Sequence, residues 1–429
     1  MRLLLFGTAA ALQLIASAPA SAGGFYLQEQ SVRGWGRANS GEVADTGAGS
    51  LWWNPAAIGG IDGHEATFGL TGVLPSGRVS NDGTLIDRPG AAPAPVGGQQ
   101  TMRDPVLKGA LPTNAAALRI SDRIALGLAV SSPFSFTTDY DEDGWQRYST
   151  IRTRLITIDL QPSVAVQATD WLSLGAGLNL EYSDAYLSSA LPNLAPGSED
   201  GKFILKGKGW DLGWSAGLQL RPAERLTIGL AYKSAVKHHL KGSVEIRGLA
   251  GPLAARNLEA PTTVDFTTPW QLIAGARAGV TERTTLNVQV VHFGWSEFGR
   301  LDLGAPLNSF IPQGYKDTWS FAFGVDQRMS EALTLRAGIQ FDGTPTRDIR
   351  RDPRVPDADR VTYAAGGSLR VSHRLTLEGA ASLTDFESSV ITRDEIFYAG
   401  TPAQTEVLSN GRASNQRALV LSLGGRMEF

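Results

Sequence analysis

The connections between the predicted strands alternate strictly between short and long. Apolar and polar residues alternate along fourteen stretches, near 64–74, 113–120, 123–132, 150–168, 171–189, 203–221, 225–246, 261–280, 283–303, 315–329, 332–343, 360–371, 374–388 and 415–429. Tight turns such as Ser121-Asp122 and Pro222-Ala223-Glu224 alternate with long segments such as 75–112 and 389–414. An even number of strands, with tight turns at one end and long loops at the other, is typical of bacterial outer-membrane barrels.

Each stretch has one apolar face and one polar face. In the last stretch, Leu419, Leu421 and Leu423 point one way, and Ser422 and Arg426 point the other. A soluble β-sandwich shows the same period, but nothing in a sandwich sorts its loops by length. A sheet in lipid must close, because every backbone N–H and C=O group needs a partner there. The sequence therefore predicts an all-β fold, a 14-stranded antiparallel transmembrane β-barrel over residues 64–429.

The N-terminus has the features of a secretory signal peptide. Arg2 supplies a positive charge, an apolar run extends from Leu3 to Ala16, and Ala20-Ser21-Ala22 forms an Ala-x-Ala cleavage site. No later apolar run reaches the roughly eighteen residues that a spanning helix needs. We therefore expect residues 1–22 to be removed and the mature chain to cross the membrane without a helix.

Residues 23–63 show neither a helical period nor strand alternation. The segment contains the aromatic residues Phe25, Trp35, Trp52 and Trp53, whereas disordered tails are poor in aromatic residues. It is also longer than an ordinary loop. Irregular backbone is tolerated at membrane depth where protein encloses it. We therefore predict that residues 23–63 form a plug, or hatch, inside the lumen of the barrel.

Composition argues against several other classes of protein. The net charge is -3, whereas a nucleic-acid-binding protein would carry a basic face. Because cysteine is absent, the chain has no disulfide, thiolate zinc site or cysteine nucleophile. His238 and His239 are adjacent on a predicted strand, so their rings point to opposite faces and cannot share a metal. The acidic residues within 139–143 fit either a solvated outer loop or a Ca²⁺ site. We expect no enzyme activity and no cofactor.

Several short motifs occur in order along nearly the whole mature chain. They are Gly24-Phe25-Tyr26-Leu27-Gln28-Glu29, Asn54-Pro55-Ala56, Trp295-Ser296-Glu297-Phe298, Tyr315-Lys316-Asp317-Thr318-Trp319, Arg336-Ala337-Gly338-Ile339-Gln340-Phe341-Asp342 and Pro356-Asp357-Ala358-Asp359-Arg360. In these motifs the chain resembles the FadL-type outer-membrane transporters of long-chain fatty acids and other hydrophobic compounds. The resemblance implies a monomer that takes up a hydrophobic small molecule passively. Its other expected partner is outer-membrane lipid, and no nucleic acid is expected to bind. Extracellular loops would capture the ligand, the hatch would move, and the ligand would leave sideways through a gap in the barrel wall.

The resemblance also implies ligand-binding or gating roles for a set of residues. They are Phe25, Trp53, Asn54, Pro55, Ala56, Pro133, Phe134 and Lys316. Phe25 matches an aromatic residue that lines the ligand pocket, although packing of the plug explains it equally well. Asn54 matches a residue that meets an inwardly kinked strand, or else it starts an ordinary Asn-Pro turn.

The kink is expected in the third strand, where Pro133 follows and cannot donate to a strand ladder. Pro133 fits equally the plain end of that strand. Lys316 fits either a ligand carboxylate or a salt bridge with Asp317. Fatty-acid transporters of this type are expected to carry a basic residue after the fifth strand, where this chain has Leu-Ser-Ser-Ala at 187–190, so a neutral hydrocarbon stays open as the ligand. The rival functions are a non-specific aqueous porin and an outer-membrane enzyme.

Overall fold

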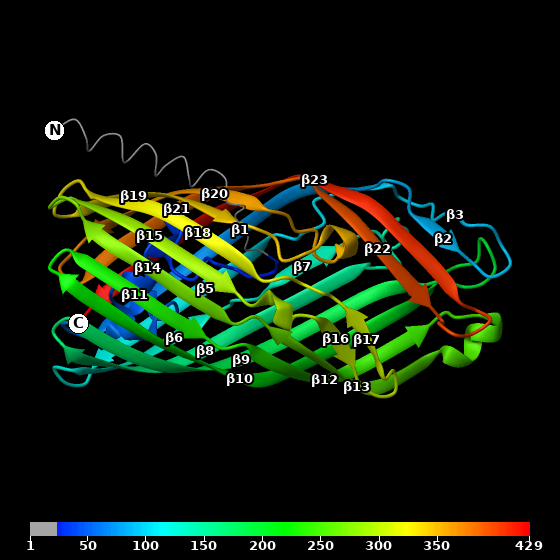
Figure 1. The fold of residues 1–429 in the computed structure, drawn as a ribbon, viewed down its shortest axis with the longest axis horizontal. Helices are drawn as coiled ribbons and strands as arrows, with labels where there is room; N and C mark the ends of the chain where they lie inside the picture. The colour runs from blue at the N-terminus through cyan, green and yellow to red at the C-terminus, as the bar shows by residue number, and fades with distance from the viewer. Residues whose placement is uncertain (1–23) are drawn as a thin grey trace.

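The chain folds into a closed barrel (Figure 1). The computed structural model describes residues 24–429, and the predicted signal peptide lies outside the described residues. Fourteen antiparallel wall strands form the barrel, which confirms the predicted architecture. The first strand, β1 (Glu65–Asn81), pairs with the last, β23 (Thr405–Glu428), and closes the sheet. The sheet therefore closes on itself into a barrel, as a sheet in lipid requires.

Several wall strands bend or break and are then labelled as two elements. Between β1 and β23 the wall consists of β5 (Gly109–Arg119), β6 (Ile124–Ser131) with β7 (Phe136–Asp139), β8 (Arg152–Thr169), β9 (Leu172–Leu191), β10 (Gly201–Ala223), β11 (Leu226–Lys233) with β12 (Val236–Arg247), β13 (Leu258–Thr268) with β14 (Gln271–Gly279), β15 (Thr284–Phe293) with β16 (Arg300–Leu303), β17 (Ser309–Pro312) with β18 (Thr318–Arg328), β19 (Leu333–Asp342), β20 (Arg360–Arg370) and β21 (Leu375–Phe386) with β22 (Ser389–Phe397). The short strands β2 (Leu85–Asp87), β3 (Ala94–Pro95) and β4 (Thr101–Arg103) extend the sheet at the loop end.

Short turns lie at one end of the barrel and long loops at the other (Figure 1). The prediction of a long loop over 389–414 is wrong, because β22 pairs with β23 from Ser389↔Ala413 to Phe397↔Thr405. This hairpin stands at the loop end, where both faces can be polar. Arg393 is buried on one face and Asp394 is exposed on the other, so the apolar alternation that marks the other strands is missing.

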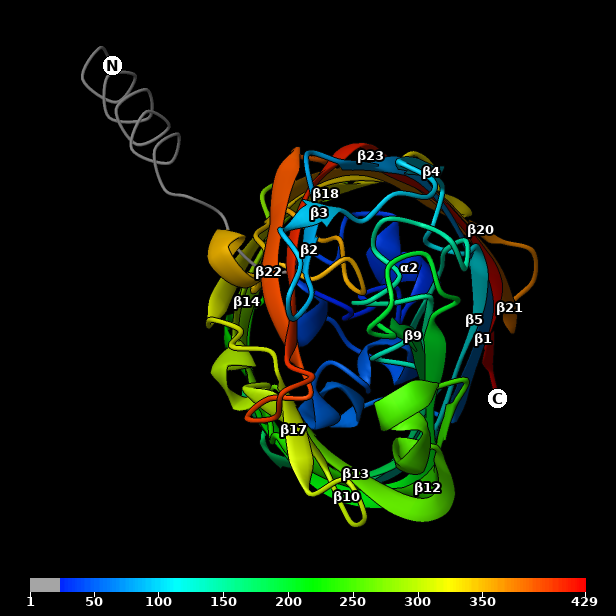
Figure 2. The same ribbon diagram turned by 90° about the vertical axis from the view of Figure 1, so that its right-hand side faces the viewer.

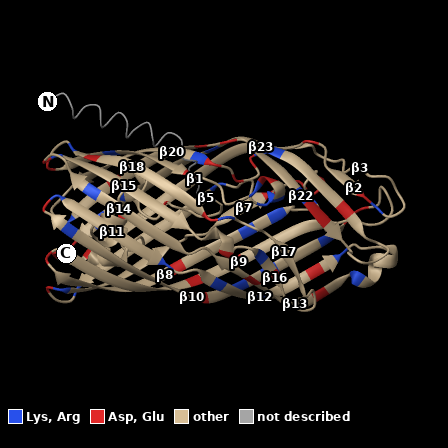
Figure 3. Cartoon of the chain, in the orientation of Figure 1, with Lys and Arg blue, Asp and Glu red and all other residues tan. Residues whose placement is uncertain are grey.

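The wall is apolar outside and polar inside. Along β8, Ile156 and Ile158 are exposed on the outer face, while Thr157 and Asp159 are buried on the inner face. Figure 3 shows that the wall beside the short-turn end is mostly uncharged between the turns and that charged residues become more frequent toward the loop end. This arrangement suits a barrel with lipid around it. None of the helices among residues 24–429 is long and apolar enough to span a membrane.

The segment before β1 lies within the ring of strands (Figure 2). Its described residues, from Gly24 on, contain four short helices, α2 (Val32–Trp35), η1 (Glu42–Ala44), η2 (Ala48–Ser50) and η3 (Pro55–Ile58). Ser31 and Asn54 cap α2 and η3, because their side chains accept hydrogen bonds from the backbone N–H groups of Gly34 and Ala56. The other three helical turns are η4 (Gly251–Arg256), η5 (Trp295–Glu297) and η6 (Asp348–Arg350), all in the loops.

The N-terminal segment contacts strands on several sides of the wall. The backbone N–H of Val43 donates to Gln289 of β15 (2.9 Å). Trp52 Nε1 donates to Asp159 of β8 (3.0 Å), and the backbone N–H of Ala48 donates to Glu65 at the start of β1 (3.1 Å). The polar inner face of the wall thus supplies hydrogen-bond partners for backbone and side-chain groups of the segment.

Glycines in the wall allow the segment to approach the backbone of the strands. A Cβ atom added to Gly338 of β19 would collide with the backbone of Arg37, and one added to Gly217 of β10 would collide with the Asn54 side chain. Glycine has no Cβ, so the segment rests directly on the strand backbone at these two points.

Candidate functional site

Phe25 is buried at the centre of an aromatic cluster. Its ring centroid lies 5.0 Å from that of Trp295 and 5.1 Å from that of Phe298. The angles between the ring planes are 74° and 70°. Phe136 and Phe134 lie 5.4 and 5.9 Å away. Such edge-to-face pairs are a preferred aromatic geometry. The cluster joins the start of the N-terminal segment to the β6–β7 connection and to the loop after β15.

A cavity of about 440 Å³ lies beside Phe25. This volume is within the range of small-molecule pockets, roughly 300–1,000 Å³. Its apolar lining includes Phe25, Leu27, Val73, Leu111, Phe136, Leu155, Val355, Phe386 and Val420. Its charged lining includes Glu29, Arg78, Lys108, Asp342, Arg354, Asp357 and Arg360. The pocket can therefore hold an apolar molecule and also offers polar groups at its boundary.

The backbone pairing of the wall is interrupted next to this cavity. β6 pairs with β5 from Arg119↔Ala125 to Asn114↔Val130. Beyond that point the chain turns inward, so that the carbonyl of Pro133 accepts a hydrogen bond from the backbone N–H of Leu27 (2.8 Å). Contact with the β5 side resumes where the backbone N–H of Leu107 donates to the carbonyl of Thr137 (2.8 Å). The inward turn leaves the first part of β5 without a partner on this side.

The cavity reaches this interruption in the wall. Leu107 and Ile156 line the cavity, yet their side chains are 42% and 40% exposed on the outside of the barrel. Ser132 and Lys108 line it from the two sides of the interruption. One continuous hollow therefore extends from the ring of Phe25 to residues of the outer face.

The structure brings Phe25, Pro133 and Phe134 together. Phe134 is buried, forms an antiparallel bridge with Tyr26, and donates its backbone N–H to Thr157 Oγ1 of β8 (2.9 Å). The sequence left open whether Pro133 marks an inward kink of the third strand or the plain end of that strand. Pro133 and Phe134 occupy the inward turn between β6 and β7.

Trp53, Asn54, Pro55 and Ala56 lie elsewhere in the N-terminal segment. Trp53 is buried and packs at a right angle against Trp52, with centroids 5.2 Å apart. Asn54 Nδ2 donates to the carbonyls of Val43 (2.7 Å) and of Leu218 in β10 (3.1 Å). Pro55 and Ala56 begin η3 and pass close to the backbone of β9. The hydrogen bonds of Asn54 therefore tie η3 to β10 rather than to the inward turn.

Lys316 lies outside the lining of the cavity. Its backbone N–H donates to the carbonyl of Pro345 (2.9 Å), and Asp317 accepts a hydrogen bond from the backbone N–H of Ser296 (2.8 Å). Within residues 24–429 no ion pair joins Lys316 to Asp317.

A group of buried carboxylates next to the cavity was not assigned a role from the sequence. Asp357 accepts hydrogen bonds from the backbone N–H of Gly24 (2.6 Å) and from Thr344 Oγ1 (2.7 Å). Arg360 lies 3.8 Å from Asp357 and 3.6 Å from Asp342. Burial raises the pKa of the Asp357 carboxyl, and Arg360 opposes that shift. The motif that contains Asp357 and Arg360 was the signal for this group, but the partners come from distant parts of the chain.

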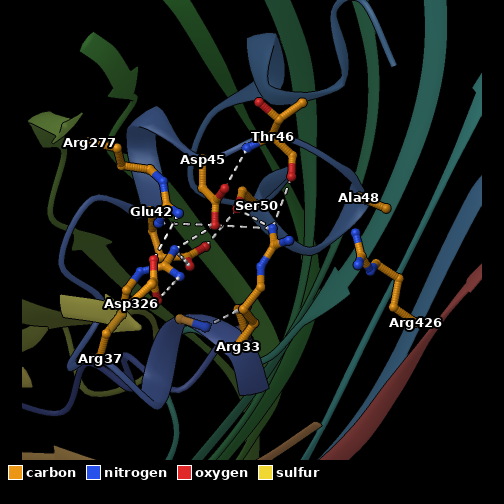
Figure 4. Close-up of polar contacts among 12 residues, drawn as sticks. Arg33, Arg37, Glu42, Asp45, Thr46, Ala48, Ser50, Arg277, Asp326 and Arg426 are labelled. Carbon is orange, nitrogen blue, oxygen red and sulfur yellow. Dashed lines mark hydrogen bonds and ion pairs between the residues drawn. The ribbon is translucent and has the colours of Figure 1, made fainter. Parts of the chain in front are cut away.

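A second charged cluster joins the N-terminal segment to the wall (Figure 4). The carboxylate of Asp45 lies 2.7 Å from Arg37, 3.3 Å from Arg33 and 3.4 Å from Arg277 of β14. Arg37 also pairs with Glu42. Burial alone would raise the pKa of the Asp45 carboxyl, but Arg277, Arg33 and Arg37 hold it well below its usual range. Asp45 is therefore charged at neutral pH.

The cluster continues into the wall strands. Asp326 of β18 lies 2.8 Å from Arg277 and 2.9 Å from Arg336 of β19. Arg37 approaches the same carboxylate at 3.6 Å. Ion pairs of this kind, once desolvated, make it costly to remove a single partner. The cluster thus fixes the helical turns of the N-terminal segment to β14, β18 and β19.

Comparisons with known proteins agree with this architecture. The family described as outer membrane protein transport protein (OMPP1/FadL/TodX) matches residues 13–429. Outer membrane protein P1 of Haemophilus influenzae is 27% identical over 418 residues, which cover 86% of this chain and 87% of the relative. The long-chain fatty acid transport protein of Escherichia coli (strain K12) is 26% identical over 401 residues, covering 83% and 86% of the two chains.

Solved structures share the fold. A Pseudomonas aeruginosa FadL homologue superposes with a TM-score of 0.83 at 24% identity, covering 95% of this chain and 100% of that chain. A toluene transporter of Pseudomonas putida, TodX, superposes with a TM-score of 0.61 at 16% identity, covering 95% and 99%. These superpositions show that the chain shares the fold of both proteins. The chain therefore belongs to the OMPP1/FadL/TodX family of outer-membrane transport proteins and resides in the bacterial outer membrane.

Proposed function

We propose that this protein takes up hydrophobic small molecules, long-chain fatty acids or hydrocarbons, passively across the outer membrane. The observation that carries the proposal is the cavity beside Phe25, which continues to the interrupted part of the wall. Relatives named as a long-chain fatty acid transport protein and as a toluene transporter support both ligand classes. A closed enzyme site or a wide aqueous pore has no corresponding observation in its favour.

The N-terminal segment acts in this proposal as a hatch that closes the lumen. Its support is the position of the segment, whose buried residues bond to β1, β8, β10 and β15. The charged cluster around Asp45 holds the lower part of the hatch to the wall, while the first residues, from Gly24 to Gln28, pack at the cavity. We infer that the first residues move during transport and that the remainder stays fixed.

Exit occurs sideways into the bilayer in this proposal. A ligand captured by the loops reaches the cavity, displaces the start of the hatch and passes between the Leu107 and Ser132 sides of the wall. The hydrogen bond from Leu27 to Pro133 and the bridge between Tyr26 and Phe134 couple the hatch to that opening. An apolar ligand gains about 0.8 kcal/mol for each buried methylene, so a route directly into lipid avoids rehydrating it.

Lys108 replaces Lys316 as the cation that we propose for a ligand carboxylate. Lys108 lines the cavity at the opening, whereas Arg354 and Arg360 already pair with Asp352 and Asp342. A fatty acid would place its carboxylate at Lys108 and its chain against Phe25. A neutral hydrocarbon needs only the aromatic cluster, so Lys108→Gln should weaken fatty-acid uptake and leave toluene uptake unchanged.

A reversible lock between the hatch and the wall tests the mechanism. Tyr26 and Phe134 face each other in an antiparallel bridge, where Cα atoms lie about 4.5–5.5 Å apart and suit a disulfide. The chain has no cysteine of its own, so Tyr26→Cys/Phe134→Cys introduces the only pair. Uptake of labelled oleate and toluene by intact cells should fall to background on oxidation and return on reduction.

The reduced double variant is the matched control, because it has lost the same two rings. Equal uptake by the oxidised and reduced forms would contradict the movement of the hatch. Cells with the unmodified protein should take up oleate or toluene faster than cells that lack the protein. Equal uptake by the two kinds of cells would contradict the proposed function itself. A large, stable conductance in planar bilayers would instead support an aqueous porin.

A further inference from the structure

The apolar outer face of the barrel ends abruptly at lysine residues on β10. From Leu220 to Trp210 the outward positions of this strand are apolar, and the next two outward positions are Lys208 and Lys206. Ten residues at about 3.3 Å each, in a strand tilted by about 40°, span a height of about 25 Å. This is the height of the apolar band of an outer-membrane barrel, so Lys208 lies at its upper edge, on the loop side.

Neighbouring strands change character at the same level. On β8 the outward Ile156 is followed by Arg154, and on β9 the outward Tyr182 is followed by Asp184. The rings of Tyr182 and Trp210 lie 5.3 Å apart across β9 and β10. Aromatic residues of this kind collect at the boundary between the membrane and water. The lysines therefore lie at the depth of lipid headgroups in the outer leaflet.

Three lysines form a compact basic patch at this level, which we define as Lys206, Lys208 and Lys241. Lys208 lies directly opposite Lys241 of β12, and Lys206 is the next residue on the same face. All three side chains are exposed. Like charges placed opposite each other in a sheet repel and destabilise it. Such an arrangement calls for an anion outside the protein.

The carboxylates near the patch are already paired with other bases. Asp184 lies 2.9 Å from Arg154, Asp265 lies 2.5 Å from His239, and Glu142 pairs with Lys202. Across the part of the chain that the structure describes, none of the three ammonium groups of the patch forms an ion pair. The patch therefore keeps its full positive charge toward the membrane.

We propose that Lys206, Lys208 and Lys241 bind the phosphate groups of lipid A, the phosphorylated glycolipid of the outer leaflet. The wall directly beneath the patch suits its acyl chains, because Trp210 and Leu212 are 60% and 61% exposed on the same face. A ligand with phosphates above and hydrocarbon below matches both parts of this surface. The site lies on the outside of the wall and is separate from the cavity beside Phe25.

Binding of diphosphorylated lipid A to the purified full-length protein in detergent, measured by native mass spectrometry, tests this proposal. Each lysine near an anionic lipid surface contributes about a fivefold factor in affinity. Lys206→Gln/Lys208→Gln/Lys241→Gln should therefore weaken binding by roughly 100-fold. Lys206→Arg/Lys208→Arg/Lys241→Arg should keep it, because the charges are retained.

The matched control removes three exposed arginines at the short-turn end, Arg225→Gln/Arg283→Gln/Arg374→Gln, and should bind lipid A as the unmodified protein does. Dephosphorylated lipid A should bind weakly to every form. Equal binding of lipid A by the glutamine variant and the unmodified protein would overturn the proposal. Full competition by inorganic pyrophosphate would overturn it as well, because the patch would then be a site for a soluble anion.

Discussion

Asp45 joins arginines of the N-terminal segment to an arginine of the wall. Its carboxylate pairs with Arg33 and Arg37 of the segment and with Arg277 of the wall. Its native pKa is lowered, so its contribution to stability is complete above the unfolded value near 4 and is lost only as the pH falls through the native value. The attachment is therefore insensitive to pH across the neutral range.

Asp45→Asn should reproduce at pH 7 what the unmodified protein shows only in strong acid. The substitution removes the ion-pair partner of Arg33 and one of the partners of Arg37 and Arg277. Breaking a buried ion pair in this way costs about 3–5 kcal/mol. We expect faster trypsin cleavage after Arg33 and Arg37 and a raised ion conductance in planar bilayers. Asp82→Asn, which removes an exposed partner of Arg412, should change neither measurement. Unchanged cleavage in Asp45→Asn would show that the cluster does not hold the segment.

At the level of single residues, the sequence predicted where a residue lies along the chain's elements better than it predicted which distant residues contact it. Pro133 was expected either at a kink of the third strand or at its plain end, because proline cannot donate to a strand ladder, and it lies in the inward turn. Asn54 was expected either to meet the kinked strand or to start an Asn-Pro turn, and it caps η3. Lys108 and Arg360 could not be assigned, because their importance depends on contact with the cavity beside Phe25, which folding brings from far along the chain.

At the scale of the elements, Gly338 of β19 determines how closely the N-terminal segment can approach the wall. Gly338→Ala places a methyl group within the backbone of Arg37, which cannot move as a flexible side chain can. Overpacking of this kind costs about 1–3 kcal/mol. We expect the segment to become more open to trypsin while the barrel keeps its heat-modifiable mobility on gels.

Gly72→Ala is the matched control for this substitution. Gly72 lies in β1, where the only neighbour of an added Cβ is a backbone oxygen at an ordinary contact distance of 3.9 Å. This variant should retain the protease resistance of the unmodified protein. Equal resistance of Gly338→Ala and Gly72→Ala would contradict the close seating of the segment on β19.

The strands were predictable because each carries its own signal. Alternation of apolar and polar residues is local, and lipid on one side enforces it on every wall strand. The β22 hairpin was not predicted because both of its faces carry charged residues, such as the buried Arg393 and the exposed Asp394, so the apolar period is missing. Pro133 suggested that the third strand bends. The sequence could not show that the carbonyl of Pro133 would accept a hydrogen bond from Leu27, which lies more than a hundred residues earlier in the chain.

For the whole molecule, the simplest test is removal of the segment. Deleting residues 23–60 should leave a barrel that inserts into the membrane, because the wall pairs with itself through β1 and β23. Without the segment the polar inner face would fill with water and conduct ions. A planar-bilayer recording should show a stable open channel, and a deletion variant that stays electrically closed would contradict the role of the segment as a plug.

The pairing of β1 with β23 also constrains the order of assembly. These strands are the first and last of the wall, and His64 and Phe429 exchange backbone hydrogen bonds at the base of their junction. Contacts between such distant parts of a chain form late, because the loop between them must first be ordered. We therefore expect the segment immediately before β1 to lie inside already when this seam closes. In this order of assembly the wall closes around the segment, and the segment is not inserted into a finished barrel.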